Sequence, residues 1–362
     1  MTGPFAHGED AFLERLRRRF AGLGAPPGAV GIGDDAAILP GRPRRVVTTD
    51  LLVEGQHFRF DLLDPADLAV RALEANLSDV AAMGARPEAA FLGLGWPRGT
   101  SSERRLPRFL ESLRKACAAR RVPLLGGDTV RVPPGATTVA LTVTGIPHRG
   151  GPVLRSGGRP GDVLVVTGTL GGSALGLALL EGRIRLPRGV AAQHLAAAAA
   201  ARYRRPAARL EAGPALAGAA RALIDLSDGI GLDLPRLARA SGCGFEVARE
   251  HLPIDPAVAQ LLPPAAALRL AIGGGEDYEL LAAVPATRLA GLLRRLAAAG
   301  VPAAPVGRLL PARAGGRLLV GGTARRWIAA GWDPFRAGRP AGLDASAPRS
   351  VFVRGRRRAA AG

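Results

Sequence analysis

The sequence contains almost no lysine. Of its 49 basic residues only Lys115 is a lysine, and no G-x-x-x-x-G-K-[ST] segment occurs. That glycine-rich loop needs its lysine to hold nucleotide phosphates, so this shortage argues strongly against a P-loop mechanism. The sequence also lacks Ser-His-Asp, H-R-D and H-E-x-x-H arrangements, which carry serine-hydrolase, protein-kinase and zinc-protease chemistry.

Cysteine and long apolar runs are scarce as well. Cys117 and Cys243 have no partner motif, so we expect neither a disulfide scaffold nor a cysteine-based zinc site. The first ten residues, MTGPFAHGED, lack the apolar region of a signal peptide. The longest bland stretch, 195–201, is too short and too rich in alanine to span a bilayer. We therefore expect a soluble cytoplasmic protein with no membrane partner.

Basic residues outnumber acidic ones, and the formal net charge is +19. Such a balance favours anionic partners such as nucleotides, phosphorylated metabolites or nucleic acid. Part of the charge is local, because residues 336–362 hold seven arginines and one aspartate. We interpret residues 337–362 as a basic, disordered tail. Nucleic acid is not the expected partner, since a polyanion binder gains nothing from the clustered aspartates described below.

The length of 362 residues predicts two domains. Residues 1–150 are interpreted as an N-terminal metal- and nucleotide-binding domain and residues 151–336 as a C-terminal domain, because 150–161 is rich in Gly and Pro. Both halves alternate strand and helix patterns, which indicates the α/β class. Strands are expected at 45–50, 89–96, 122–125, 137–147, 162–167, 223–226, 278–284 and 306–310, and helices at 64–84, 101–121, 173–181, 191–202 and 214–223.

Six short acidic motifs recur along the chain, next to Gly or hydroxyl residues, and we expect them at the ends of elements. They are GIGDDA (31–36), TTD (48–50), NLSD (76–79), GGDT (126–129), DLSDG (225–229) and GGGEDY (273–278). Aspartate is a hard oxygen ligand that suits Mg²⁺, and nearby Gly lets a phosphate approach backbone N–H groups. Like charges repel, so such a carboxylate-rich site requires cations.

Each motif taken alone has a simpler interpretation. Asp228 followed by Gly resembles an ordinary turn, and Asp225 with Ser227 could cap the next helix. Asp79 could be a solvated helix residue. Asp50 is harder to dismiss, because it closes an expected strand, where α/β folds gather their ligands.

A site that holds two anions through Mg²⁺ is the economical explanation. Phosphoryl transfer depends mostly on positioning and charge neutralisation. If the acceptor is itself a phosphate, its oxygen is ionised near neutral pH, since the second pKa is about 6. No general base is then required.

Three further residues each have two interpretations. His57 lies close to the TTD motif and is either a partly buried structural histidine or a contact to the acceptor phosphate. Arg155 is either one exposed arginine among many, the simpler interpretation, or a clamp on a nucleotide phosphate. Trp332 is either a core residue or a face on which a flat cation stacks.

In combination these motifs resemble the thiamine-monophosphate kinase family, over about 12–335. That family shares a superfamily with aminoimidazole-ribotide synthetase, selenophosphate synthetase and a hydrogenase-maturation protein. The most specific matches are GIGDDAA (31–37), TTDLLVEGQHF (48–58), NLSDVAAMGARP (76–87), GGDT (126–129), DLSDGI (225–230), GGEDYEL (274–280) and GWDPF (331–335). Pro334 departs from the family's usual histidine, and residues after 335 have no counterpart.

The resemblance implies an ATP- and Mg²⁺-dependent conversion of thiamine monophosphate to thiamine diphosphate by direct in-line transfer. It implies two α/β domains of the aminoimidazole-ribotide synthetase type, with the N-terminal domains of two chains pairing into a homodimer. The implied metal ligands are Asp35 (preferred over Asp34), Thr48, Thr49, Asp50, Asp79, Asp128, Asp225 and Asp228. The implied ATP-side residues are Gly127, Asp128, Arg155 and Ser227, and the implied acceptor-side residues are His57, Glu276 and Trp332.

Sibling enzymes are the nearest alternatives. A selenophosphate synthetase would need a reactive N-terminal Cys or selenocysteine with a Lys, and the hydrogenase-maturation relative would end in Cys; the sequence shows neither feature. An aminoimidazole-ribotide synthetase would differ around the first acidic motif. A non-catalytic nucleotide- or nucleic-acid-binding protein is the alternative from another class.

Overall fold

The structure is a computed structural model of the whole chain. The part of the chain that it describes comprises residues 10–11, 14, 17–18, 27–30, 32–185, 188–327 and 329–333. The interpretation of residues 337–362 as a basic tail lies outside these residues, as does Pro334. No helix in the described part combines the length and the apolar character needed to cross a bilayer.

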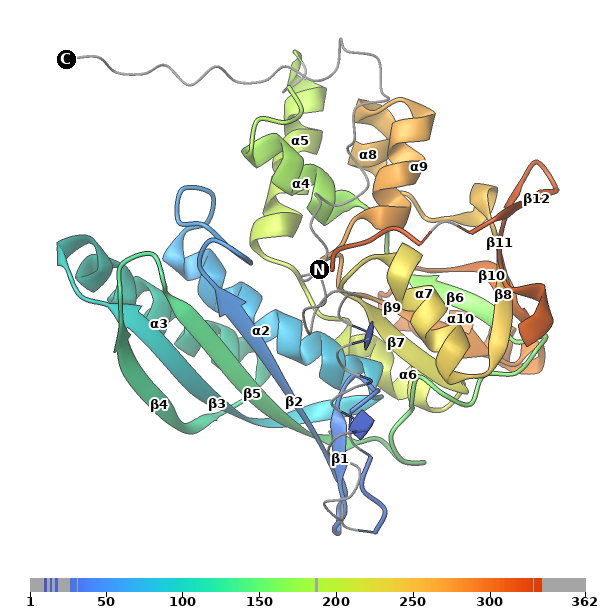
Figure 1. Ribbon diagram of the computed structural model, residues 1–362, viewed down its shortest axis with the longest axis horizontal. Helices are drawn as coiled ribbons and strands as arrows, with labels where there is room; N and C mark the ends of the chain where they lie inside the picture. The colour runs from blue at the N-terminus through green and yellow to red at the C-terminus, as the bar shows by residue number, and fades with distance from the viewer. Residues whose placement is uncertain are drawn as a thin grey trace.

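The first half forms a five-stranded sheet with the order β1-β2-β5-β3-β4. Only β3 and β4 run parallel, so the sheet is mixed. Helices α2 and α3 lie on one face and leave the face toward the viewer without a helix (Figure 1). The elements are β1 (Ala37–Leu39), β2 (Arg45–Val53), α2 (Pro65–Ala82), β3 (Ala85–Pro97), α3 (Thr100–Arg120), β4 (Leu124–Val132) and β5 (Thr138–Pro147).

Helix α2 begins and ends as the sequence predicts. The Asp64 side chain caps it by accepting the Ala66 N–H, and Pro65 occupies the first helical position. At the other end the Gly84 N–H bonds to the Ala81 carbonyl, with Gly84 at φ +59°. The expected apolar face is confirmed, since Leu73, Leu77, Val80 and Ala81 are fully buried.

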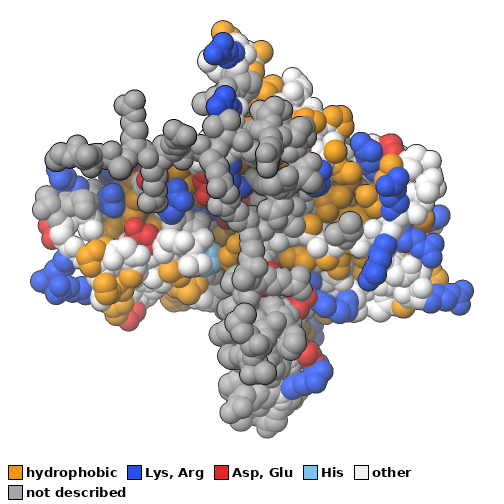
Figure 2. Space-filling view, turned by 45° about the horizontal axis from the view of Figure 1, so that its top comes forward, with side chains coloured by type: hydrophobic (Ala, Val, Ile, Leu, Met, Phe, Trp, Pro, Cys, Tyr) orange, Lys and Arg blue, Asp and Glu red, His pale blue; other side chains and the backbone are white. Residues whose placement is uncertain are grey.

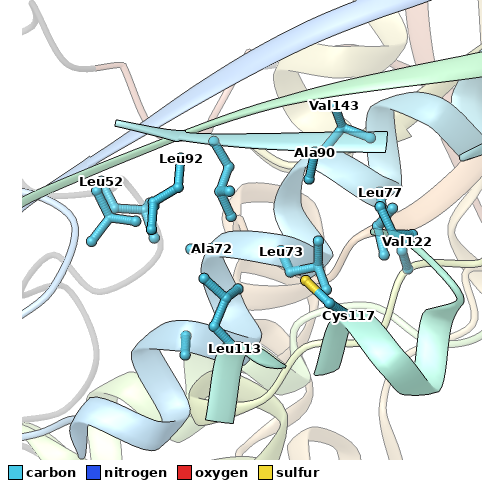
Figure 3. Packing of buried hydrophobic residues seen from close by; sticks show 14 of the residues in the cluster. Leu52, Ala72, Leu73, Leu77, Ala90, Leu92, Leu113, Cys117, Val122 and Val143 are labelled. Atoms are coloured by element: carbon cyan, nitrogen blue, oxygen red, sulfur yellow. The ribbon is translucent and has the colours of Figure 1, made fainter. Parts of the chain in front are cut away.

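The core of the first half lies between α2, α3 and the sheet. Figure 3 shows Leu73 of α2 and Leu113 and Cys117 of α3 grouped beneath the strand residues Leu92 and Val143. With few aromatic side chains available, aliphatic residues of α2 and the strands provide most of this packing. The buried face of the sheet therefore fixes α2 against β2.

The second half forms a seven-stranded sheet with the order β12-β11-β8-β10-β6-β9-β7. One face packs on α7, through Leu234 and Leu237, and the other on α6 and α10, through Leu292 and Leu296. The strands are β6 (Val163–Thr167), β7 (Ala222–Leu226), β8 (Cys243–Ala248), β9 (Glu279–Val284), β10 (Ala303–Pro311), β11 (Gly316–Val320) and β12 (Thr323–Arg326). The helices against this sheet are α6 (Gly213–Ala217), α7 (Ile230–Ala240) and α10 (Ala286–Ala298).

Four helices form a separate group beside this sheet (Figure 1). They are α4 (Gly172–Leu180), α5 (Val190–Arg204), α8 (Pro256–Leu261) and α9 (Pro264–Gly273). Three short 3₁₀ segments complete the elements that the described residues form: η2 (Leu210–Ala212), η3 (Arg249–His251) and η4 (Ala312–Ala314). Among the described residues on the face shown in Figure 2, the basic side chains are scattered rather than gathered into one stripe.

Several expectations about the elements were wrong. TTD lies inside β2, NLSD inside α2 and GGDT inside β4, so only the other three motifs lie at element ends. The segment expected as a short strand at 122–125 extends to Val132 and carries GGDT as strand residues. The helix expected at 214–223 ends at Ala217, where Gly218 follows. Asp225 and Ser227 do not cap α7, whose N-cap is Gly229.

Candidate active site

A cavity of about 950 Å³ lies between the two halves of the chain. From the first half, β2 and α2 contribute to its wall, and from the second half the turn after β7 and the turn before β9. Most of the sequence-predicted site residues line it: Asp35, Thr48, Thr49, Asp50, His57, Asp79, Arg155, Asp225, Ser227, Asp228, Glu276 and Trp332. Residues more than 200 positions apart in the sequence thus meet in one place.

Three aspartates from three different segments come together in this cavity. Carboxylate oxygens of Asp35, Asp79 and Asp225 all lie within 4.8 Å of one another. Asp35 precedes β1, Asp79 lies in α2, and Asp225 lies near the end of β7. Asp79 is therefore not a solvated helix residue. Three carboxylates this close repel one another strongly unless protons or cations reduce their charge.

Neighbouring polar side chains hold these carboxylates in place. The Thr48 hydroxyl donates to Asp79 Oδ2 at 2.5 Å, and the Ser78 hydroxyl donates to Asp225 Oδ2 at 2.8 Å. The Asp50 N–H donates to the Asn76 side-chain oxygen at 3.2 Å. Helix α2 thus positions groups on β2 and β7, because its packing between them brings its NLSD turn to both.

Burial and mutual repulsion perturb the acids of the cluster. The pKa of Asp79 is raised well above its usual value by burial and by the charges of Asp50 and Asp225. The pKa of Asp225 is raised likewise by burial and by Asp35. Burial and the charge of Asp228 raise the pKa of Asp50 to about 6. Such perturbed groups in a cavity mark a functional site, and a bound cation would lower their pKa values again.

The donor set fits a hard divalent cation. The Asp35 Oδ2 atom is buried and has no hydrogen-bond partner among the described residues, although an unpaired buried carboxylate oxygen is costly. It belongs to a group of carboxylates that lies beside the Thr48 hydroxyl. Carboxylate and hydroxyl oxygens are the hard ligands that Mg²⁺ prefers. Asp34 instead accepts the Arg155 N–H at 3.1 Å, so the geometry favours Asp35 over Asp34 as a ligand. The Thr49 hydroxyl pairs with Thr142 at 2.8 Å and is not part of the cluster.

Two of the arginines that line the cavity pair with sequence-predicted site aspartates. Arg155 donates to Asp35 Oδ1 at 2.8 Å, so its simpler interpretation as an exposed surface arginine was wrong. Arg236, in α7, is paired with Asp228 and also with Asp233 at 2.9 Å. The two guanidinium groups supply part of the positive charge that the neighbouring carboxylates require.

Two turns of the second half lie against each other through their backbones. The Glu276 N–H donates to the Ser227 carbonyl at 2.6 Å, and the Trp332 N–H donates to the Asp228 carbonyl at 3.1 Å. A Cβ atom at Gly275 would lie 2.7 Å from the Ser227 carbonyl oxygen, so only glycine permits this approach. The acidic turn after β7 therefore sets the position of the Glu276 and Trp332 side chains.

Rings from both halves meet at the end of the cavity where Glu276 lies. The ring centroids of His57 and Trp332 are 5.5 Å apart at an interplanar angle of 59°. His57 Nδ1 accepts the Val53 N–H at 3.1 Å, which leaves Nε2 to carry the proton of the neutral ring. Burial and the charge of Arg71 lower the pKa of His57. Both rings line the cavity, so His57 is placed to do more than fill the core.

Gly127 and Asp128 are not brought into this cavity. They lie on β4, opposite Leu92 and Gly93 of β3, and both residues are exposed. Gly127 adopts φ +150°, and a Cβ there would lie 1.8 Å from the Leu92 carbonyl oxygen. Glycine is therefore needed for the β3–β4 pairing, whatever else it does. Within one chain Asp128 does not join the cluster of Asp35, Asp79 and Asp225.

Several groups that shape the site were not indicated by the sequence. Arg71 and Arg236 could not be told from the many other arginines, because only the fold shows that they face carboxylates. Tyr278 lines the cavity at φ +50°, and burial raises the pKa of its hydroxyl above the usual range. Ser78 belongs to NLSD and Tyr278 to GGGEDY, and their places in these motifs are the signals that the sequence offers.

The fold and this acid-lined cavity between two domains define a family. The family model "AIR synthase related protein, N-terminal domain" matches residues 33–147, and the model "AIR synthase related protein, C-terminal domain" matches residues 159–318. Hydrogenase-maturation protein HypE of Escherichia coli shares the fold, with a TM-score of 0.63 at 20% identity over 91% of this chain and 98% of that chain.

Nearer relatives narrow the assignment. Thiamine-monophosphate kinase of Escherichia coli strain K12 is 41% identical over 282 residues, 77% of this chain and 84% of the relative. The Caulobacter vibrioides enzyme of that name is 36% identical over 291 residues, 78% of this chain and 79% of the relative. The solved structure "AaThiL complexed with AMPPCP and TMP" has a TM-score of 0.75 at 27% identity, covering 90% of this chain and 96% of that chain. The chain belongs to the thiamine-monophosphate kinase family and is an enzyme of the phosphotransferase class.

Proposed function

We propose that this enzyme transfers the γ-phosphoryl group of ATP to thiamine monophosphate in the cytoplasm, giving ADP and thiamine diphosphate. One observation carries the proposal. A buried acid cluster and a pair of aromatic rings share a single cavity, and each is built from both halves of the chain. The first suits cation-bridged phosphates, and the second suits a flat cationic heterocycle.

The transfer is direct. An oxygen of the acceptor phosphate forms a bond to the γ-phosphorus while the bond from that phosphorus to the bridging oxygen of ADP breaks. The attacking oxygen is already ionised near neutral pH, so no residue has to remove a proton. His57 lines the cavity, has a lowered pKa and lies beside Trp332 at the acceptor end.

The residues of the chain position the two anions. Asp35, Asp50, Asp79, Asp225 and Asp228, with the Thr48 hydroxyl, would hold Mg²⁺ ions, which when bound supply the positive charge that phosphoryl transfer needs. Arg155 adds a fixed guanidinium at the nucleotide side, where it is oriented by Asp35. We expect Ser227 to contact the nucleotide as well.

The acceptor end selects the substrate. Trp332 provides a face for the thiazolium ring, and Glu276 provides a carboxylate for its charge or for the amino group of the pyrimidine. His57 lies beside Trp332, and its Nδ1 already accepts the Val53 N–H, so its Nε2–H is the group that would donate to a phosphate oxygen.

A coupled ADP-release assay tests this reaction. The enzyme is supplied with ATP and Mg²⁺ and either thiamine monophosphate or unphosphorylated thiamine. We expect ADP and thiamine diphosphate only with the monophosphate. Equal activity with thiamine would contradict the phosphate-acceptor reasoning, and inactivity of folded protein with both would refute the substrate.

We further propose that Asp128 and Gly127 complete the site of a second copy of the chain in a homodimer. Strand β4 is an edge strand, and large apolar side chains are exposed on it and on other strands of its sheet: Leu51, Phe91, Leu124, Leu125 and Val130. Exposed apolar patches on an unpaired strand mark association surfaces. Pairing there would give the Asp128 carboxylate a role that it does not have within one chain.

Mixed dimers test this arrangement. Asp128→Asn and Asp225→Asn are each expected to be inactive, but subunits that exchange after mixing should regain about a quarter of the wild-type activity. The estimate follows because half of the dimers are mixed and each has one intact composite site. No recovery in exchanged mixtures, or a monomer in light scattering, would show that Asp128 does not act across subunits.

A further inference from the structure

Arg71 is a completely buried arginine in an otherwise apolar stretch of helix. It lies in α2 among residues that form the core, and its side chain is 0% exposed. A buried charge is costly unless partners compensate it. Its environment therefore indicates which groups the helix holds in place.

Among the described residues, the hydrogen-bond and ion-pair partners of Arg71 come from the second half of the chain. One guanidinium nitrogen donates to the Tyr203 backbone carbonyl at the end of α5, and the other pairs with Glu276 Oε1. The guanidinium carbon also lies 4.6 Å from the centre of the Tyr203 ring, within the range of a cation–π contact. Arg71 thus links α2 to the turn before β9.

The backbone of Glu276 is held by hydrogen bonding, whereas its side chain is open to the cavity. Its backbone adopts φ +66°, a conformation that is unfavourable for a residue with a side chain, and its N–H is held by the Ser227 carbonyl. The side chain is 31% exposed and lines the cavity. Among the described residues, Arg71 is the one partner of its carboxylate, and it engages only Oε1.

We propose that Arg71 is a positioning residue for the acceptor: it fixes Glu276 so that the remaining carboxylate oxygen accepts a hydrogen bond from the amino-substituted, cationic heterocycle. The proposal rests on the proposed function and deepens it. Because Arg71 already balances the charge of Glu276, the carboxylate acts as a directed hydrogen-bond acceptor, not as a free counter-charge. Recognition of the acceptor then depends on the direction of this hydrogen bond more than on attraction between net charges.

Four variants separate positioning from mere support of the fold. Arg71→Met removes the guanidinium and keeps most of the volume, and Arg71→Lys keeps the charge. The double variant Arg71→Met with Glu276→Gln removes both charges together, so no buried charge is left unpaired. Arg205→Met is the matched control, because Arg205 joins the end of α5 to Asp67 of α2 in an exposed ion pair.

We expect Arg71→Met to raise the KM for thiamine monophosphate at least tenfold and the KM for ATP less than twofold. Arg71→Lys should recover part of that loss, and Arg205→Met should leave both values unchanged. The double variant should regain thermal stability but not acceptor affinity. A double variant with a wild-type acceptor KM, or equal effects of Arg71→Met on both KM values, would overturn the proposal and leave Arg71 a structural residue.

A second measurement does not depend on the substrate. The charge of Arg71 contributes to the lowered pKa of His57, whose ring lies beside Trp332 and whose Nδ1 accepts the Val53 N–H. In Arg71→Met the His57 titration followed by NMR should move to higher pH, with His57→Gln used to assign the signal. An unchanged titration would show that Arg71 does not act on this end of the cavity. A different outcome is that the His57 titration moves as expected while the wild type is inactive with thiamine monophosphate. That outcome would refute the proposed substrate, and with it the acceptor role of Arg71.

Discussion

We predict that the ionised Asp50 carboxylate lowers the free energy of unfolding of the protein when no metal is bound. Burial and Asp228 raise the pKa of Asp50 from 3.8 to about 6. A tenfold change in an ionisation equilibrium corresponds to about 1.36 kcal/mol, so keeping Asp50 ionised costs about 3 kcal/mol at pH 8. The Asp50 carboxylate makes no hydrogen bond to another described residue, and the bond from its backbone N–H to Asn76 does not depend on the side chain. Asp50→Asn should therefore remove the cost without removing a contact.

The sign of the effect follows from proton linkage. Because the folded-state pKa lies above the unfolded-state value, the folded protein binds more protons between these two values, and stability falls as pH rises through this window. The cost is complete above about pH 7, about half as large at pH 5, and absent well below pH 4. In EDTA, Asp50→Asn should thus exceed the wild type in stability by about 3 kcal/mol at pH 8 and by about 1.5 kcal/mol at pH 5.

Denaturant unfolding in EDTA at both pH values measures this difference, and Mg²⁺ titration completes the test. Asp61→Asn is the control, since Asp61 is exposed and its pKa is lowered by the hydrogen bond from Arg59, so it should show no gain. With Mg²⁺ the wild type should gain more stability than Asp50→Asn, and turnover of the variant should be nearly abolished. A variant no more stable than the wild type at pH 8 would refute the reasoning.

Three further substitutions probe other parts of the site. Ser78→Ala removes the buried donor to Asp225 and should lower the free energy of unfolding by about 1–3 kcal/mol in denaturant titrations; no change would mean that this hydrogen bond is dispensable. His57→Ala should raise the acceptor KM and leave the KM for ATP unchanged in steady-state kinetics, whereas an unchanged acceptor KM would return His57 to a structural role. Arg236→Ala should strengthen Mn²⁺ binding measured by EPR, because a cation that competes for Asp228 is removed. Arg239→Ala is its control, and equal Mn²⁺ affinity in both variants would contradict the competition.

The sequence predicted the α/β class and the main elements of the first half well. Helix α2 was recognisable because Asp64 and Pro65 mark its start and the apolar period runs through Val80. Four helices and four strands have no counterpart among the expected elements: α7, α8, α9, α10, β1, β8, β11 and β12. Pro235 lies inside α7 and weakens its helical signal, and all four residues of the short strand β12 are exposed, so no buried apolar face marks it as a strand.

The acidic motifs identify the residues of the cavity but not the elements that carry them. Acidic residues next to Gly or hydroxyl residues predict element ends, yet Asp50 lies inside β2 and Asp79 inside α2. Alternation along a strand brings Thr48 and Asp50 to the same face as α2, while Thr49 points to Thr142. A local pattern cannot show this, because the face that a residue takes depends on what covers the sheet.

The counter-charges were beyond any local pattern for a different reason. Carboxylates are the minority charge in this chain and stand out in motifs, whereas arginines are abundant everywhere. Three arginines nevertheless form ion pairs with acids of the cavity: Arg155 with Asp35, Arg236 with Asp228, and Arg71 with Glu276. Asp50, Asp79 and Asp225 form no such ion pair among the described residues, and their pKa values are raised by burial and repulsion. The arginines thus leave three of the proposed Mg²⁺ ligands without an ion-pair partner, and a bound cation would supply the missing positive charge.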